Sequence, residues 1–218
     1  MARRGETRIE MRTTRLEAFS DGVFAIATTL LVLNLQIPKG SKDLATALGD
    51  QWPVYAAYAI GFLTIGIVWI NHHAIFDHVK AVDRTTLFLN LLFLLVIAVI
   101  PFPTALLAEY LRDPGGSGHL AALVFAASMT AMALLFFSVW LHISRTERLG
   151  CDLGPEAVRT LTRQYGIGTA VYALAIPVAL VSAVATLVIY AGVLLFYVTE
   201  RIEGAGSPES RSRERERG

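Results

Sequence analysis

Long apolar runs, separated by short polar segments, dominate this chain and predict helices that cross a membrane. The first run, residues 18–37, has 20 residues and contains one ionisable side chain, that of Asp21. At about 1.5 Å per residue, such a helix matches the thickness of the hydrocarbon core of a bilayer. Similar runs occur at about residues 52–71, 86–108 and 119–142. We expect each of these runs to cross the membrane once.

The last apolar stretch, residues 166–199, is too long for a single crossing. Its 34 residues would form one continuous helix well beyond the span of a bilayer at ordinary tilt. We therefore expect two helices, divided near Ser182, with the first beginning around Glu156. Pro101 and Pro103 lie inside the third run and should bend or break that helix. The pattern predicts an all-α, polytopic membrane protein with six transmembrane helices.

Composition and charge agree with this architecture. Hydrophobic residues make up 54% of the 218 residues, and the mean hydropathy is +0.53. Of the 19 Lys and Arg residues, 16 fall in segments on one side of the predicted membrane and 3 on the other. Because Lys and Arg accumulate in cytoplasmic loops, we expect both termini in the cytoplasm.

The chain divides into three predicted regions. Residues 1–17 are polar and basic and show no cleavable signal peptide, so we expect a cytoplasmic N-terminus. Residues 18–203 form the six-helix transmembrane domain. Residues 204–218 have almost nothing apolar to bury, so we expect a disordered cytoplasmic tail. The single cysteine, Cys151, excludes an internal disulfide and a CxxC metal site.

The first predicted helix has two different surfaces. On a helical wheel, Ile26, Leu30 and Leu33 form one apolar stripe, with Thr29 at its edge. From the pattern alone, such a stripe favours a lipid-facing surface or a helix contact over a pore lining, since nearly every transmembrane helix has one. Ser20 and Asp21 point away from the stripe, so the polar face needs partners in neighbouring helices.

A carboxylate inside a membrane helix requires a partner or a task. Asp21 could form a structural ion pair with Arg15, or it could serve a proton relay or a cation site. Candidate hydrogen-bond donors lie in the next two helices: Trp69, Asn71, His72, His73, His78 and Asn90. Since the adjacent histidines point to different helix faces and no carboxylate lies at convincing ligand spacing, we expect structural histidines and no metal site.

Short motifs stand in each of the first three predicted helices: Arg15-x-x-x-Phe19-Ser20-Asp21, then Gly66-x-x-Trp69-x-x-His72-His73-x-x-Phe76, then Leu89-Asn90-Leu91-Leu92-Phe93 and Pro101-Phe102-Pro103-Thr104. Together they resemble the transmembrane protein 175 family of potassium channels, in its bacterial single-repeat form. The resemblance covers the first half of the chain. The fourth to sixth helices match that family only in number and hydropathy, and the chain has no TVGYG loop.

The resemblance implies a homotetramer in the bacterial inner membrane, with a central pore lined by the first helix of each subunit. It places the narrowest ring at Ile26, further apolar rings at Leu30 and Leu33, and a threonine near the ring at Thr29. It also implies a structural polar network that orients the pore helix, formed by Arg15, Phe19, Ser20, Asp21, Trp69, His73 and Asn90.

The function implied is a potassium-permeable cation channel with a hydrophobic constriction and modest selectivity over sodium. Potassium is the permeant ion; no cofactor and no nucleic-acid partner are expected. The alternative is a proton-coupled secondary transporter that uses Asp21 and His73. A non-conducting scaffold also remains open. A membrane enzyme is disfavoured, because no HExxH, GxSxG or paired catalytic carboxylates lie within a span.

Overall fold

The structure is a computed structural model of the chain, and it describes residues 3–38, 43–80, 82–113, 116–146, 149 and 153–205, with side chains described between residues 13 and 195. Regular structure in these residues is helical, apart from one isolated β-bridge between Val79 and Leu149. The elements are α1 (Arg3–Leu30), the 3₁₀ helix η1 (Leu31–Asn34), α2 (Leu44–Asp50), α3 (Trp52–Phe76), α4 (Arg84–Val99), α5 (Pro101–Tyr110), α6 (Gly116–Arg145), α7 (Pro155–Ala179) and α8 (Ala183–Ala205).

The first four predicted spans are confirmed as membrane-length helices. Within the described residues, the segments long and apolar enough to cross a bilayer are Thr13–Asn34, Trp52–Phe76, Arg84–Tyr110 and Gly116–Arg145. The predicted division of the last stretch is also present, because α7 ends at Ala179 and α8 begins at Ala183. The apolar part of α8, Ala183–Leu195, is shorter than a full span. Six crossings therefore stay a prediction.

The ends of the first helix differ from the prediction. α1 begins at Arg3, 15 residues before the predicted start at residue 18, because Arg, Glu and Met are good helix formers whether or not lipid surrounds them. At its other end the helix tightens to 3₁₀ geometry and stops at Asn34, and Leu35 is already extended. The predicted tail, residues 204–218, overlaps the last residues of α8, and beyond Ala205 it lies outside the described residues.

A short helix between the first two spans, α2, was not expected from the sequence. Asp43 caps it by accepting a hydrogen bond from the backbone N–H of Ala45 at 3.1 Å and another from the Thr46 hydroxyl. Both bonds hold the pKa of the Asp43 carboxyl below its usual range, and the bond from Thr46 has the larger effect. With only seven residues, α2 carries too weak a periodic pattern to recognise.

The predicted break in the third span is confirmed. α4 ends at Val99 and α5 begins at Pro101, with Ile100 between them. Proline lacks an N–H and its ring clashes with the preceding turn, so it starts a helix more readily than it continues one. The side-chain amide of Asn34 donates to the Pro101 carbonyl at 3.4 Å, which joins the end of η1 to this break.

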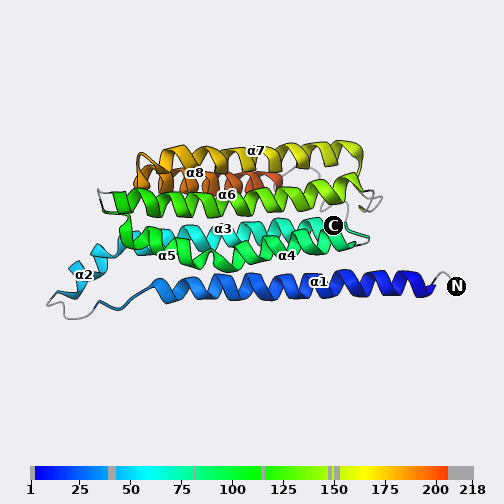
Figure 1. Cartoon of the computed structure of the whole chain (residues 1–218), viewed down its shortest axis with the longest axis horizontal. Coiled ribbons are helices and arrows are strands. Elements are labelled where there is room, and N and C mark those ends of the chain that lie inside the picture. Colours follow the sequence, from blue (N-terminus) through cyan, green and yellow to red (C-terminus); the bar gives the residue numbers. More distant parts are fainter. Residues whose placement is uncertain are drawn as a thin grey trace, which may run out of the picture.

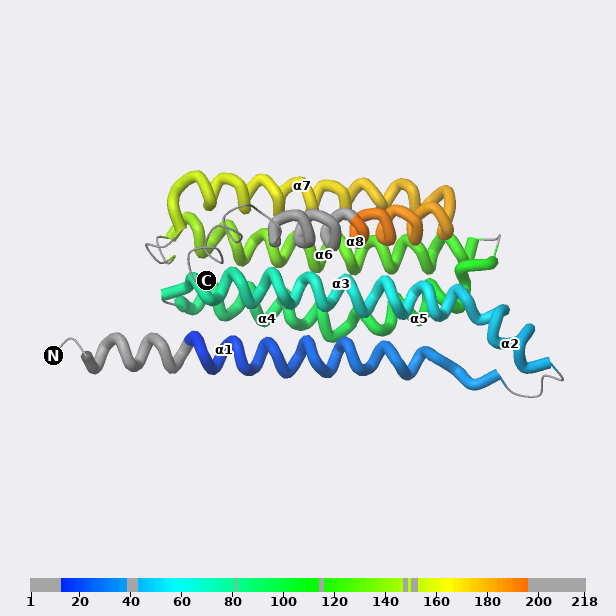
Figure 2. The backbone as a smooth tube through the Cα atoms, turned by 180° about the vertical axis from the view of Figure 1, so that it is seen from behind, coloured from blue at the N-terminus to red at the C-terminus, as the bar shows by residue number. Residues whose placement is uncertain are grey.

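The helices form three layers, as Figure 1 shows: α1 on one side, α3 with α4 and α5 in the middle, and α6 with α7 and α8 on the other side. The reverse view in Figure 2 gives the same order, with α2 at one end of the bundle. α1 packs against α3 and α4, both in the middle layer. Among the largest fully buried side chains are Phe93 in the middle layer and Phe125 and Trp140 in the far layer.

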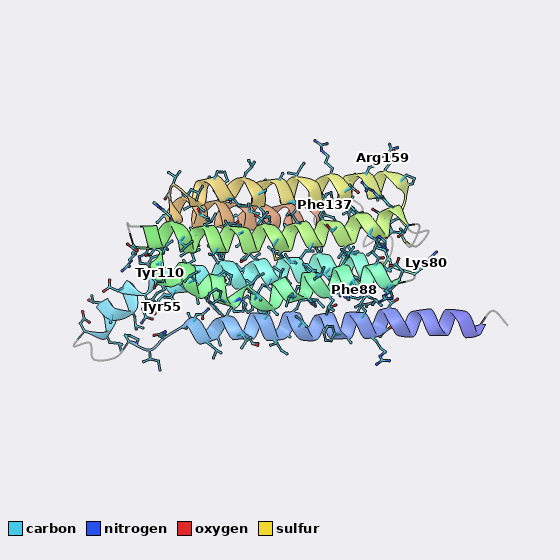
Figure 3. The ribbon with its side chains drawn as sticks, viewed as in Figure 1. Tyr55, Lys80, Phe88, Tyr110, Phe137 and Arg159 are labelled. Carbon is cyan, nitrogen blue, oxygen red and sulfur yellow. The ribbon has the colours of Figure 1, made fainter. Side chains whose placement is uncertain are left out.

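Two labelled basic residues mark one end of the bundle. Lys80 and Arg159 lie toward the same end, in different layers, whereas Tyr55 and Tyr110 lie at the opposite end (Figure 3). This placement agrees with the charge pattern that assigned the 80–84 and 145–163 segments to the same side of the membrane. The cytoplasmic identity of that side stays a prediction.

Candidate functional site

The outer face of α1 carries large apolar side chains. Along the chain, the exposed fraction is 61% for Ile26, 41% for Leu30 and 71% for Leu33. On the opposite face of the same helix, Phe24 and Leu31 are almost fully buried against the middle layer. The stripe read from the helical wheel is therefore a real surface, on the side of α1 that turns away from the rest of the chain.

The lower part of this stripe lies in 3₁₀ geometry, which the helical wheel did not anticipate. In a 3₁₀ turn the side chains at i and i+3 eclipse each other, so η1 brings Leu33 closer into line with Leu30. Thr29 is also exposed, and its hydroxyl donates to the carbonyl of Ile26 at 2.9 Å. That bond uses the hydroxyl proton and leaves oxygen lone pairs for another partner.

A buried hydrogen-bonded chain joins α1, α4 and α3 behind the stripe. The Ser20 hydroxyl donates to the carbonyl of Leu16 at 2.9 Å and accepts from the side-chain amide of Asn90 at 3.0 Å. The amide oxygen of Asn90 lies 2.8 Å from Nε2 of His72. Because an amide oxygen can only accept a hydrogen bond, the contact with Asn90 requires that His72 carry its proton on Nε2. Ser20, His72 and Asn90 are each at most 2% exposed.

Aromatic rings enclose this chain. The His72 ring stacks on Phe76 with ring centroids 4.4 Å apart and on Phe93 at 5.7 Å, and it meets the edge of Phe24 at 5.4 Å. In such an apolar setting an unpaired polar group is costly, so the Ser20–Asn90–His72 chain fixes one arrangement of the three helices.

A second contact between α1 and α3 lies beside the first. Nε1 of Trp69 donates to a carboxylate oxygen of Asp21 at 2.8 Å, and the indole stacks on the His73 ring with centroids 6.0 Å apart. Of the residues in the predicted polar network, the structure brings Ser20 to Asn90 and Asp21 to Trp69. The histidine that reaches Asn90 is His72, which the predicted network did not include, and not His73.

A periodic signal in the sequence could have separated the two histidines. The buried positions of α3 include Gly61, Ile65, His72 and Phe76, which recur at helical spacing along one stripe. His73 falls off that stripe and is exposed. Both imidazoles belong to the same motif, and projecting α3 onto a helical wheel separates them.

Arg15 and Phe19 lie apart from this cluster. They line a groove between α1 and the start of α4, together with Leu16, Val82, Asp83, Arg84 and Leu87. Asp83 caps α4 by accepting from the backbone N–H of Thr86 at 2.8 Å, and its carboxylate lies 3.1 Å from Nε2 of His142 on α6. The structure therefore does not join Arg15 to Trp69, His73 or Asn90 in the part of the chain that it describes.

The expectation that no carboxylate lies at ligand spacing from a histidine is wrong. Asp77 follows His73 by one helical turn, and its carboxylate lies 3.7 Å from Nε2 of His73. Glu17 approaches the same pair from α1. The i, i+4 spacing of His73 and Asp77 is a signal in the sequence that could have identified this pair, whereas Glu17 is distant from both in the chain.

The fold and this site define a polytopic helical membrane protein in which one long helix is anchored on one face and exposed on the other. The model for the family described as endosomal/lysosomal potassium channel TMEM175 matches residues 15–101. A potassium channel of Streptomyces collinus is 49% identical over 186 residues, which cover 84% of this chain and 90% of that relative. The chain belongs to the TMEM175 family of potassium channels.

Two more comparisons support membership of this family. The crystal structure of a lysosomal potassium-selective channel TMEM175 homolog from Chamaesiphon minutus matches with a TM-score of 0.77 and 35% identity, covering 87% of this chain and 98% of that one. The endosomal/lysosomal proton channel TMEM175 of Mus musculus is 34% identical over 157 residues, which cover 65% of this chain and 31% of that relative. The relatives are named as ion channels, which confirms that the chain is not an enzyme.

Proposed function

We propose that this protein is a potassium-permeable cation channel, formed by four copies whose α1 helices line a central pore. The observation that carries the proposal is the exposed apolar face of α1, made by Ile26, Leu30 and Leu33 on a helix whose other face is firmly anchored. The names of the bacterial relatives, which are potassium channels, support the choice of ion.

In this proposal each subunit crosses the bacterial inner membrane six times, with both termini in the cytoplasm. α7 and α8 supply the fifth and sixth crossings. Lys80 and Arg159 lie at the same end of the bundle, as the two crossings between them require. Exposed apolar side chains on α4, among them Phe88, Leu91 and Leu95, offer further surface for neighbouring subunits or lipid.

Conduction through such a pore depends on hydration. Four copies of Ile26 would form a narrow apolar ring, with rings of Leu30 and Leu33 beyond it. A narrow apolar constriction expels water and stops ions, whereas a slightly wider one passes water and partly hydrated ions. Potassium holds its water less tightly than sodium, so it loses part of its shell more easily. Without a cage of carbonyl oxygens, selectivity is modest.

Thr29 is the residue that can offset part of the dehydration. Its hydroxyl proton is committed to the Ile26 carbonyl, so the hydroxyl oxygen can face a cation as an acceptor. Four such oxygens beside the ring would replace a few of the lost water contacts.

The buried polar contacts act as the anchor of the pore helix. Rotating α1 by one residue moves every side chain by 100°, which would turn Ile26 away from the axis. The Ser20–Asn90–His72 chain and the Asp21–Trp69 bond oppose such a rotation, because each would leave polar groups unpaired in an apolar layer.

The transporter alternative assigns Asp21 and His73 to a proton relay. In the structure the Trp69 indole contacts both residues, with its N–H committed to Asp21 and its ring face on His73. An indole N–H is a donor only, so it cannot accept the proton that a relay through it would require. The anchoring role is therefore the one we propose for Asp21.

The test is a reversal-potential measurement on the purified protein in a planar bilayer, with potassium on one side and sodium on the other. We expect ohmic single-channel currents and a reversal potential displaced toward that of potassium. Saturable flux that requires a proton gradient, with no unitary currents, would overturn the channel in favour of a carrier. The absence of any current or flux would indicate a scaffold.

A further inference from the structure

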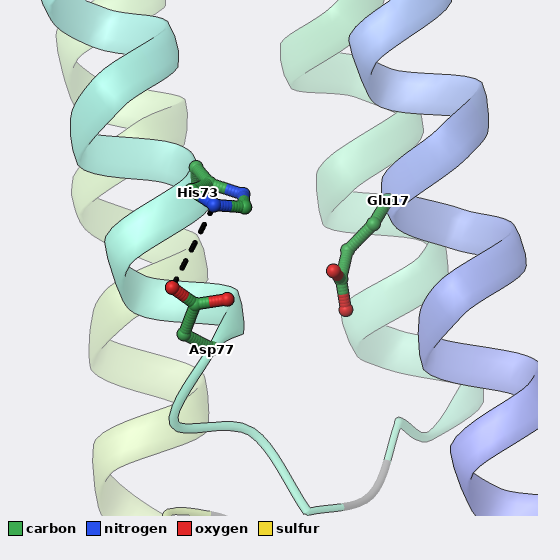
Figure 4. A group of neighbouring side chains, drawn as sticks. All are labelled: Glu17, His73 and Asp77. Carbon is green, nitrogen blue, oxygen red and sulfur yellow. Dashed lines mark ion pairs between the residues drawn. The ribbon is translucent and has the colours of Figure 1, made fainter.

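Three side chains with metal-binding atoms converge where α3 ends beside α1. Figure 4 shows His73 and Asp77 on the end of α3, facing Glu17 from α1. One ligand atom of each residue lies within 4.8 Å of those of the other two, and Nε2 of His73 is 3.7 Å from the Asp77 carboxylate. Because His73 and Asp77 are one turn apart, they present their ligand atoms to the same side.

We propose that Glu17, His73 and Asp77 bind a divalent transition-metal ion of the zinc class. One imidazole nitrogen and two carboxylate oxygens form a ligand set that suits zinc, with water at the remaining position. Magnesium, calcium and potassium prefer oxygen ligands alone, so the imidazole directs the site toward a borderline-soft ion. The metal is distinct from the permeant ion of the proposed channel.

The geometry allows the site to close with small movements. Ligand atoms bound to one tetrahedral zinc lie about 3.4 Å apart, given bonds of about 2.1 Å. The ligand atoms lie within 4.8 Å of one another, so they need to approach by up to about 1.4 Å. The side chains of His73 and Asp77 are 51% and 55% exposed, which gives an ion a path of entry.

The surroundings favour a cation. Asp21 lies one turn along α1 from Glu17, so a third carboxylate adds its charge to the same seam. Trp69 donates to Asp21 and stacks on the His73 ring at an interplanar angle of 16°. The indole thus holds the imidazole plane beside the carboxylates, as residues behind metal ligands do in established sites.

A bound ion would join α1 to α3 at the end of the bundle where Lys80 lies. This crosslink would be separate from the Ser20–Asn90–His72 chain, because His73 and His72 leave α3 on different faces. Binding itself does not depend on conduction.

The test is calorimetric titration of the purified full-length protein in detergent with zinc chloride, after removal of metal with a chelator. We expect one zinc ion per chain. Glu17→Gln, His73→Gln and Asp77→Asn should each weaken binding by tenfold or more. His78→Gln, one residue beyond Asp77, and His119→Gln, on α6, are the matched controls and should bind zinc as the original protein does.

A ligand replacement guards against loss of folding. His73→Cys should restore binding relative to His73→Gln, because a thiolate also ligates zinc. Zinc uptake no greater than that of empty micelles would overturn the site, as would equal affinity of His73→Gln and the unmodified protein. Conduction in the planar bilayer without zinc uptake would contradict the metal site alone. Zinc binding without any current would contradict the proposed channel alone.

Discussion

The inner face of α1 and its continuation η1 presents Ser20, Phe24 and Leu31 to the middle layer, where they are at most 3% exposed. The outer face presents Ile26, Leu30 and Leu33, which are exposed and make no polar contact through their side chains. The two faces lie on the same turns of one helix, yet one is specified by directional hydrogen bonds and the other only by being apolar. The hydrogen bonds of the inner face therefore decide which residues the apolar outer face exposes.

The largest expected effect on stability comes from removing the hydrogen bonds at the centre of the buried Ser20–Asn90–His72 chain. Asn90→Leu removes the donor to Ser20 and the acceptor of His72, so the His72 N–H loses its partner in an apolar enclosure. We expect the free energy of unfolding to fall by about 2 kcal/mol. Unfolding by SDS in mixed micelles measures this change. Asn34→Leu is the control, since it removes one long, partly buried bond and should lower stability by much less.

A smaller effect should separate the two adjacent histidines. His72→Phe keeps an aromatic ring in the Phe76–Phe93 enclosure but leaves the amide oxygen of Asn90 unpaired, at a loss of about 1 kcal/mol. His73→Phe keeps the ring face on Trp69 and should change stability by less than about 0.5 kcal/mol. The same SDS unfolding series compares them. Equal losses for the two variants would contradict the assignment of His72 to the buried chain.

Asp21→Asn should have a slighter effect on stability, because an amide oxygen can still accept from the Trp69 indole at the same place. We expect a loss of about 0.5 kcal/mol. Potassium flux in liposomes should persist in this variant, since its anchor is intact. If flux disappears while the protein stays folded and assembled, the charge of Asp21 has a direct part in transport.

The smallest effect on stability is expected on the outer face. Ile26→Asn exchanges an exposed side chain and should leave unfolding almost unchanged, within about 0.5 kcal/mol. Its effect should fall on conduction instead: a polar ring stays wet, so liposome flux should rise several-fold and potassium-over-sodium selectivity should fall. Leu174→Asn, equally exposed on α7, is the control and should alter neither. Unchanged flux and selectivity for Ile26→Asn would remove this residue from the proposed constriction.

Hydropathy and periodicity were sufficient to predict the four membrane-length helices, the break at Pro101 and the division before Ala183. These features depend on local chemistry: runs of apolar residues and a missing N–H are visible in the chain itself. The start of α1 and the short α2 were not predicted, because a helix can extend into water and seven residues carry little pattern.

The candidate site was predictable where it depends on one helix and less so where helices meet. The exposed stripe on α1 follows from the spacing of Ile26, Leu30 and Leu33. The motifs indicated which helices hold polar residues near Ser20 and Asp21, but they did not indicate the individual pairs or that His72, and not His73, reaches Asn90. The approach of Glu17 to His73 could not be predicted from spacing, because it depends on how α1 and α3 are aligned along their lengths.

The order of the three layers has a consequence for how the molecule can change. α1 packs against the middle layer, while α6, α7 and α8 cover the opposite side of that layer (Figure 1). The far helices therefore bear on α1 through the middle layer that lies between them. A change on the outer side of α7 has to pass through two packed layers before it can alter the surface that α1 displays.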